Sequence, residues 1–138
     1  MPSRNPSLLT KLPTPLLSLA SHQFAGRGRG KNVWLSLSGC LQFSILLRVS
    51  LASFPANKLV FIQYLFTLAV VEASREKNVL GKWGERLRVK WPNDIYALVG
   101  EEKRKVGGVL VNTNFSGGNV DVIIGEGFLV TSTLRYLF

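Results

Sequence analysis

The segment of this chain best suited to chemistry is a loop rich in glycine and arginine, residues 23–32, with the sequence QFAGRGRGKN. Its glycines let the backbone approach a ligand closely, and successive exposed N–H groups form a concavity that binds anions. Arg27 and Arg29 can add bidentate contacts to a phosphate or a carboxylate. Backbone N–H groups together with two arginines are suited to binding nucleotide phosphates and an acyl phosphate. Two alternatives remain open for the loop alone: a flexible basic loop without a ligand, and an Arg-Gly segment that binds RNA.

A second candidate cluster is the run Lys90-Trp91-Pro92-Asn93-Asp94. Pro92 ends the strand predicted over residues 86–91, so Asn93 and Asp94 are presented at the end of that strand, where functional residues are common. A carboxylate there can hold Mg²⁺ together with oxygens of a bound phosphate. The alternative for Asn93 and Asp94 is an Asx-type turn. For Lys90 it is a place on the solvated face of the strand.

The third cluster is Lys105-Val106-Gly107-Gly108. Two adjacent glycines in a strand leave room for another group to pack against the backbone. Lys105 lies at the start of this strand, where its ammonium can reach a carboxylate or a phosphate. The alternative, favoured for this segment alone, is a β-bulge preceded by a charged, solvated loop over residues 101–105.

The elements that position these clusters follow from hydrophobic spacing and turn residues. A helix is predicted over residues 58–77, with Asn57 as its N-cap. Strands or extended segments are predicted over 16–24, 33–35, 42–50, 86–91, 107–114 and 120–124, and residues 116–119 form a hairpin turn between the last two. A helix followed by several strands indicates an α+β fold with a largely antiparallel sheet.

Composition narrows the classes further. The chain has 138 residues, the size of one domain, and 46% of them are hydrophobic, which argues against general disorder. The single cysteine, Cys40, excludes an internal disulfide and fits a reducing compartment. The formal net charge is +9, and no acidic residue precedes Glu72. A basic first half indicates an anionic partner, a membrane surface or a targeting segment.

Membrane insertion and targeting are the weaker of these possibilities. The best apolar run, residues 59–71, contains Gln63 and is shorter than the roughly 18 residues that a membrane-spanning helix needs. Prolines at positions 2, 6, 13 and 15 disfavour a continuous amphipathic helix at the N-terminus. We therefore expect a phosphate-bearing ligand and no membrane partner.

Together, and in this order, the segments HQFAGRGRGKNVWLS, RVKWPNDIY and KVGGVLVNTNFSGGNVDVIIG closely resemble the catalytic domain of biotin–protein ligases (holocarboxylase synthetases), above all the fungal-type members. The resemblance runs from about residue 5 to residue 127, and the set of motifs is far more specific than any one of them. It implies an α+β fold with a mixed, mainly antiparallel sheet and packed helices, as in class II aminoacyl-tRNA synthetases and biotin ligases. Lipoate ligases share this fold class, but GRGRG with KWPND favours biotin.

The resemblance also implies an activity. Ligases of this family form a C–N bond in two steps: biotin and ATP, with Mg²⁺, give biotinyl-5′-AMP, which a lysine of a biotin carrier domain in a carboxylase then attacks. The partners implied are thus biotin, ATP and such carrier domains, with neither a membrane nor nucleic acid. The expected location is the cytoplasm, with the mitochondrion as the alternative.

Individual roles carry over by position. The resemblance implies that biotin and its adenylate are bound by eight residues: Gln23, Arg27, Gly28, Arg29, Trp34, Lys105, Gly107 and Gly108. Arg29 and Lys105 would act on the reacting groups, chiefly by electrostatic stabilisation. Lys90 and Asn93 would contact the nucleotide, and Asp94 would hold Mg²⁺. His22 and Cys40 are expected to be structural neighbours only.

The sequence departs from the family in two places. Family members carry a Ser-Thr-Asn segment upstream of the region that matches residue 5. They also usually read Gly-x-Gly-Ile-Asn near residues 125–129, where this chain has Gly-Glu-Gly-Phe-Leu. The Asn is missing, Glu126 falls at an expected buried apolar position, and residues 128–138 diverge. A buried unpaired carboxylate is costly. We therefore predict a partial catalytic domain over residues 1–138.

Two alternatives to an active ligase domain follow. One is a degenerate domain that binds a partner or nothing, which the two departures favour. The other is a basic module that binds nucleic acid, favoured only by net charge and by the Arg-Gly loop. We rank it last, because the aromatic residues fall largely in the predicted helix and strands rather than along a basic face.

Overall fold

The computed structural model describes residues 6–36 and 38–130. In chain order the elements are α1 (Pro6–Leu9), β1 (Leu16–Ala20), β2 (Gly26–Arg27), β3 (Val33–Trp34), β4 (Cys40–Ser50), the 3₁₀ helix η1 (Ala56–Phe61), α2 (Ile62–Ser74), the 3₁₀ helix η2 (Gly81–Arg86), β5 (Leu87–Lys90), β6 (Asp94–Val99), β7 (Glu102–Ser116) and β8 (Asn119–Leu129). The chain therefore contains both helices and strands, as expected for an α+β fold.

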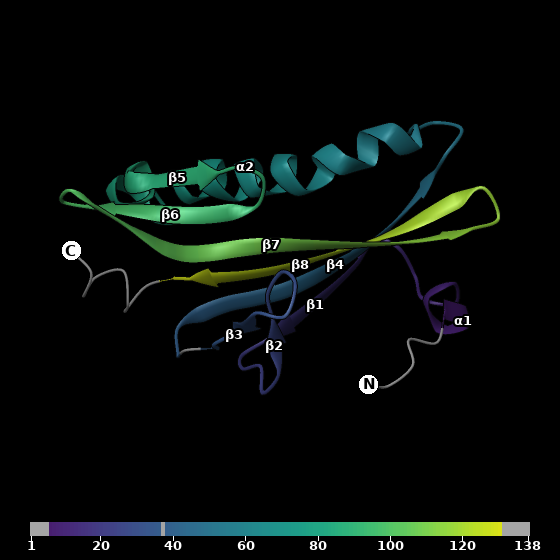
Figure 1. Cartoon of the computed structure of the whole chain (residues 1–138), viewed down its shortest axis with the longest axis horizontal. Helices are drawn as coiled ribbons and strands as arrows, with labels where there is room; N and C mark the ends of the chain where they lie inside the picture. The colour runs from purple at the N-terminus through teal and green to yellow at the C-terminus, as the bar shows by residue number, and fades with distance from the viewer. Residues whose placement is uncertain (1–5, 37, 131–138) are drawn as a thin grey trace.

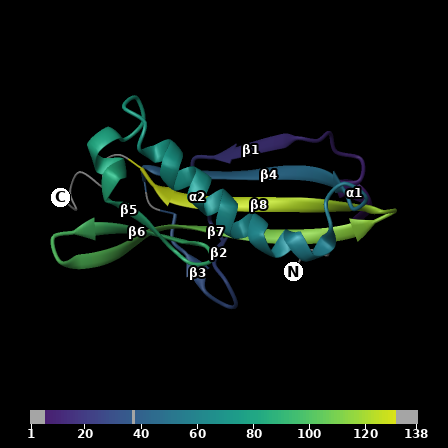
Figure 2. The ribbon, with the colours of Figure 1, turned by 90° about the horizontal axis from the view of Figure 1, so that it is seen from above.

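A six-stranded sheet with the order β1-β4-β8-β7-β6-β5 forms the centre of the molecule. Every neighbouring pair in it is antiparallel. Helix α2 runs across one face, while the small β2–β3 ribbon lies against the opposite face (Figure 1; Figure 2 looks down on α2). The predicted fold class is confirmed.

The two faces of the sheet differ in chemistry, and β8 makes the division clear. Successive strand residues point to opposite faces. Val120, Val122 and Ile124 point toward η1 and α2 and belong to a buried cluster with Leu59. We call this side the helix face. The intervening residues, 121, 123, 125 and 127, lie on the opposite side, which we call the site face.

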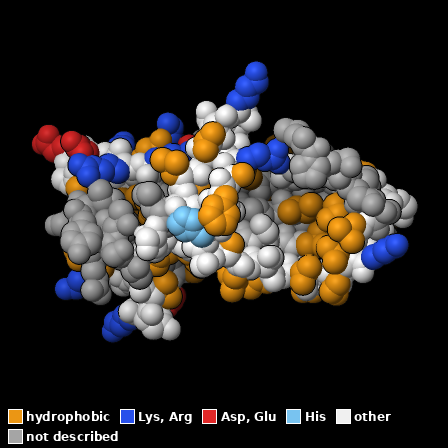
Figure 3. All heavy atoms as spheres, turned by 90° about the horizontal axis from the view of Figure 1, so that it is seen from below, with side chains coloured by type: hydrophobic (Ala, Val, Ile, Leu, Met, Phe, Trp, Pro, Cys, Tyr) orange, Lys and Arg blue, Asp and Glu red, His pale blue; other side chains and the backbone are white. Residues whose placement is uncertain are grey.

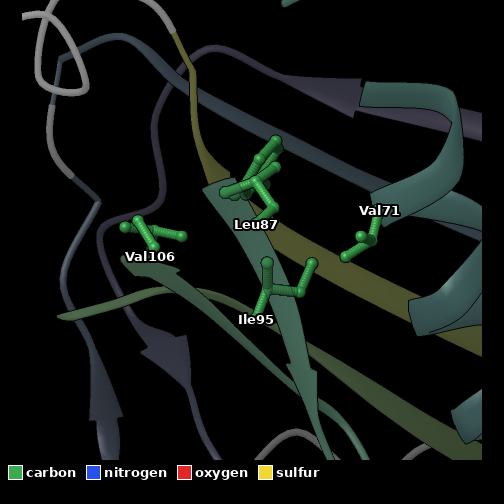
Figure 4. Packing of buried hydrophobic residues seen from close by; sticks show 6 residues of the cluster. Val71, Leu87, Ile95 and Val106 are labelled. Carbon is green, nitrogen blue, oxygen red and sulfur yellow. The ribbon is translucent and has the colours of Figure 1, made fainter. Parts of the chain in front are cut away.

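A second buried cluster packs beneath the C-terminal half of α2. Val71 is 1% exposed, and Leu87 and Ile95 are fully buried beside Val106 (Figure 4). Complete burial of each such side chain contributes about 1.5–3 kcal/mol. Helix α2 reaches this cluster because its buried residues Thr67, Val71 and Ser74 recur at helical spacing.

The predicted helix exists, but its start differs from the prediction. The chain enters through the 3₁₀ turn η1 and becomes α-helical only at Ile62. The N-cap prediction for Asn57 is wrong: the cap residue of η1 is Pro55, and it makes no side-chain capping hydrogen bond. By length and composition alone, Ala56–Ser74 would also suffice to cross a membrane. The expectation that this apolar run is too short is therefore wrong, and only 11% of its most apolar 18-residue window is buried, although α2 packs on the sheet through Thr67, Val71 and Ser74.

Two strand segments in the second half were not predicted from the sequence. Residues 94–99 form β6, whose Ile95 and Ala97 are fully buried. The charged segment expected as a loop is the exposed start of β7, paired with β6 from Glu102 onward. The alternative of a β-bulge here is confirmed. Ile95 pairs with Gly107 and Tyr96 with Lys105, so Val106 is the extra residue.

The predicted hairpin turn joins β7 and β8. Gly117 and Gly118 have φ of 56° and 77°, the left-handed values that a two-residue turn of type I′ requires. The turn sets a register in which Gly108 faces Gly127 and Leu110 faces Gly125. It thereby aligns the glycines of both strands on the site face.

Candidate functional site

A cavity of about 1020 Å³ opens on the site face, close to the upper end of the range for small-molecule sites. Figure 3 views this side of the molecule: Lys and Arg side chains project at several points, while acidic ones gather mostly at one end. The cavity is lined by nine of the residues predicted for the site: Gln23, Arg27, Gly28, Arg29, Trp34, Asn93, Asp94, Lys105 and Gly108. The fold thus brings all three sequence clusters to one place.

The basic loop is held in a defined conformation at the cavity wall. Gly26 and Arg27 pair with Trp34 and Val33 in the β2–β3 ribbon. Within the loop, the Gly28 N–H donates to the Asn32 carbonyl at 2.8 Å. The ends of the loop are thus tied together by backbone pairing, and its predicted role in binding an anion stays a prediction.

Asn93 joins the basic loop to the sheet. Arg29 Nη1 donates to Asn93 Oδ1 at 2.9 Å, and Asn93 Nδ2 donates to the Val109 carbonyl at 2.9 Å. The backbone N–H of Val109 donates in turn to the Asn93 carbonyl at 2.9 Å. Asn93 is only 3% exposed. Its amide therefore orients Arg29 toward the cavity, a role that sequence reasoning missed because the two residues are 64 positions apart.

Lys105 and Asp94 form an ion pair in the cavity, with Lys105 Nζ 2.7 Å from Asp94 Oδ1. Both side chains remain partly accessible, at 44% and 23% exposure. The pair holds the ammonium next to Gly108, at which an added Cβ would lie 3.5 Å from Asp94 Oδ1. The glycine leaves this charged corner open to a ligand.

Asp94 was predicted to hold Mg²⁺. Within residues 6–36 and 38–130, no group of three or more His, Cys, Asp or Glu side chains could hold a metal ion. A site with a single carboxylate fits only an ion that brings most of its oxygen ligands with it, as Mg²⁺ bound to nucleotide phosphates does. The residues present fit that mode of binding and exclude a metal site built from several side chains of this part of the chain.

Trp34 forms part of the cavity wall and packs against β8. An added Cβ at Gly127 would lie 2.7 Å from Trp34 Nε1 and 2.8 Å from Cε2, closer than real Cβ atoms approach. Gly127 therefore has to lack a side chain for the indole to take this place. Gly127, the second glycine of the Gly-Glu-Gly run, thus allows Trp34 to occupy its position in the cavity wall.

Lys90 and Gly107 are the two predicted site residues that do not line the cavity. Lys90 Nζ lies over the Tyr96 ring, 5.3 Å from its centroid. Gly107 faces the helix side, where an added Cβ would lie 2.9 Å from Phe128 Cδ2. The prediction that Gly107 makes room for a ligand is therefore wrong: it makes room for Phe128, and Gly108 alone borders the cavity. His22 and Cys40 also lie outside the lining.

Glu126 is buried, as its place between two glycines indicated. It is 3% exposed, and neither carboxylate oxygen has a hydrogen-bond partner among the described residues. This burial raises the pKa of Glu126 to about 8. The residue borders the cavity along β8, but strand alternation directs its side chain to the helix face, beside its neighbours Phe43 and Val109.

A model of the "Biotin/lipoate A/B protein ligase family" matches residues 4–128. The chain belongs to this family. The match includes every residue that we predicted for the site, and the predicted family is confirmed.

Within the biotin/lipoate ligase family, the chain is similar in sequence to biotin–protein ligases. The biotin–protein ligase of Homo sapiens is 42% identical over 118 residues, which are 86% of this chain and 16% of that protein. The biotin–protein ligase of Schizosaccharomyces pombe is 33% identical over 137 residues, 94% of this chain and 22% of that protein. The chain therefore spans about a fifth of the length of these relatives.

A solved family member has the same fold. The biotin acetyl coenzyme A carboxylase synthetase of Helicobacter pylori, with bound biotinylated ATP, superposes with a TM-score of 0.57 at 26% identity. The superposition covers 86% of this chain and 50% of that protein. The central antiparallel sheet described above is therefore the biotin ligase sheet.

Proposed function

We propose that this chain forms the part of a biotin ligase that binds biotin and ATP and makes biotinyl-5′-AMP. One observation carries the proposal: the basic loop, Asn93-Asp94 and Lys105 line a single cavity. Three cationic side chains, Arg27, Arg29 and Lys105, line this one cavity and suit a reaction between two anions, the carboxylate of biotin and the triphosphate of ATP.

In the first step, a biotin carboxylate oxygen attacks the α-phosphorus of ATP, and the bond to pyrophosphate breaks. Negative charge builds up on the phosphate oxygens and on the leaving pyrophosphate. Arg29, oriented by Asn93, offers a planar fork of donors to these oxygens. Lys105 offers a compact positive charge, held in place by Asp94. No covalent enzyme intermediate is needed, since positioning and electrostatic stabilisation supply the catalysis.

Asp94 is the residue that would hold Mg²⁺, which when bound would neutralise charge on the nucleotide phosphates. Its carboxylate also contacts Lys105. Asp94 thus links the ammonium proposed for the biotin carboxylate to the ion proposed for ATP. With the ammonium and the ion used as proposed, the two substrates would lie next to each other in the cavity.

In the second step, the ε-amine of an acceptor lysine attacks the biotinyl carbonyl, forms an amide bond and releases AMP. We propose a biotin carrier domain of a carboxylase as the acceptor. The Helicobacter pylori relative is itself described as a synthetase of an acetyl coenzyme A carboxylase. Arg27 and Arg29 are exposed at the cavity edge, so an adenylate bound there remains within reach of a second protein.

The proposal is tested by biotin-dependent exchange of ³²P-pyrophosphate into ATP, together with thermal stabilisation by biotin. We expect exchange in the unaltered chain and its loss in Arg29→Ala. Arg104→Ala is the matched control, because Arg104 is half-exposed and pairs with Glu102 outside the cavity. Absence of exchange and of biotin binding in a folded, unaltered chain would refute the proposal.

A second candidate function, a degenerate domain without ligase activity, draws on one observation. Glu126 introduces a buried carboxylate without a partner into the sheet. The same experiment decides between the two: a degenerate domain shows neither exchange nor a stability change with biotin.

A further inference from the structure

A buried amide lies directly behind the cavity wall. Gln42 on β4 is 1% exposed and pairs with Gly127 of β8, so its side chain lies on the site face next to the glycine that Trp34 covers. Its Nε2 donates to the hydroxyl oxygen of Ser36. That same oxygen accepts a hydrogen bond from the backbone N–H of Gln23 at 2.9 Å.

The Ser36 hydroxyl lies close to two residues of the cavity wall. Gln23 and Trp34 both line the cavity, and both are close to Ser36: Gln23 through its hydrogen bond and Trp34 through the chain, two residues away. Ser36 itself is only half-buried and follows the short strand β3. Gln42 belongs to an 11-residue strand in the middle of the sheet, so it is the rigid member of the set.

Stability alone does not explain an amide at this position. Gln42 Oε1 has no hydrogen-bond partner among the described residues, and neither has the neighbouring Trp34 Nε1. A buried acceptor without a partner lowers the stability of the fold, and an apolar side chain of similar size would avoid that penalty. Core stability therefore does not account for the amide of Gln42, and its hydrogen bond to Ser36 is the remaining explanation for a polar side chain at this position.

We infer that Gln42 is a positioning residue for the biotin site: through Ser36 it holds Gln23 and Trp34 at the cavity wall. The inference rests on the proposed function, since this inference takes Gln23 and Trp34 to be residues that bind biotin. Gln42 does not itself line the cavity. Its effect on a ligand is therefore indirect and falls on binding rather than on the reacting atoms.

The test uses the whole chain and the variants Gln42→Leu and Ser36→Ala. We expect the Kd for biotin, measured by calorimetry, to rise about three- to tenfold in each, as expected for one lost hydrogen bond. We expect no further rise in the double variant, because both changes break the same link. Thermal stability of Gln42→Leu should stay equal or increase, since the unmet amide is gone.

Val120→Ala is the control for a purely structural effect. Val120 is fully buried on the helix face at the far end of β8 and does not line the cavity. This variant should lower the Tm and leave the Kd for biotin unchanged. If Gln42→Leu instead behaves like Val120→Ala, or if its Kd equals that of the unaltered chain, the positioning role is wrong.

A readout without ligand separates this inference from the proposed function. Hydrogen exchange of the Gln23 backbone amide, followed by NMR, should accelerate in both Gln42→Leu and Ser36→Ala and remain slow in Val120→Ala. An unaltered chain that binds no biotin would refute the proposed function, while the exchange rate still reports on the link. Unchanged exchange in Gln42→Leu would overturn the inference whatever the ligand result.

Discussion

The stability of this chain should fall as the pH rises from 5 to 8, and Glu126 should be the cause. Burial raises the pKa of its carboxyl from 4.5 to about 8 in the folded protein. Because the folded state binds this proton more tightly than the unfolded state, the neutral acid favours folding. That advantage is complete below pH 4.5 and is lost progressively up to about pH 8.

The magnitude follows from the shift. Each pKa unit corresponds to about 1.4 kcal/mol, so Glu126 should lower the free energy of unfolding by about 3 kcal/mol between pH 4.5 and pH 7. A domain of this size is stabilised by roughly 5–15 kcal/mol in total. The loss is therefore a large share of the whole, and a single replacement should recover it.

Glu126→Gln keeps the shape of the side chain and removes the titration. Urea unfolding at pH 5, 6, 7 and 8 should give nearly equal stabilities for both proteins at pH 5. At pH 8 the variant should be more stable by several kcal/mol. Glu126→Leu should be more stable still at every pH, because it also removes the unmet polar atoms.

Glu102→Gln serves as the control, since Glu102 is 67% exposed and pairs with Arg104 at the surface. Its stability difference from the unaltered chain should not change with pH. His22 and the other carboxyl groups are common to all these proteins, so the difference between them isolates the substituted residue. Parallel stability curves for the unaltered chain and Glu126→Gln would refute the reasoning.

Two further substitutions test the site. Lys105→Ala should weaken biotin binding about tenfold or more, as expected for a lost hydrogen bond to a charged group, whereas Lys103→Ala on the same strand should leave the calorimetric Kd unchanged. Gly127→Ala should displace the Trp34 indole, which would sit 2.7 Å from the new Cβ, and lower the free energy of unfolding by about 1–3 kcal/mol. Unaltered tryptophan fluorescence and urea midpoint in Gly127→Ala would contradict this contact.

Local chemistry in the sequence was enough to predict the larger elements. The hairpin at residues 116–119 was predicted because two adjacent glycines can take the positive φ that its turn needs. The body of α2 was predicted from helical spacing of apolar residues. Its start was not, because Asn57 can cap a helix, yet the chain turns through η1 before the α-helix begins.

Strands whose charged residues are exposed were the elements that sequence patterns missed. The segment beginning at Glu102 has the composition of a loop, but pairing with β6 makes it a strand. The tie between Arg29 and Asn93 was also invisible, because no local pattern marks a contact between residues so far apart in the chain. Lys90 and Gly107 were assigned to the site from their neighbours in the motifs, whereas strand alternation and the bulge at Val106 determine which face each residue occupies.

Along Gly125-Glu126-Gly127, the alternation of residues between the two faces of β8 puts the glycines and the glutamate on opposite sides of the sheet. The glycines lie on the site face, where Gly127 accommodates Trp34. The glutamate lies on the helix face, where Val122 and Ile124 are buried. Glu126 therefore bears on the stability of the sheet, and the glycines bear on the shape of the cavity. If Glu126→Leu raises the free energy of unfolding and leaves the Kd for biotin unchanged, the departure at this position is a matter of folding and leaves the ligand site intact. A change in the Kd alone would place the Glu126 side chain in the site.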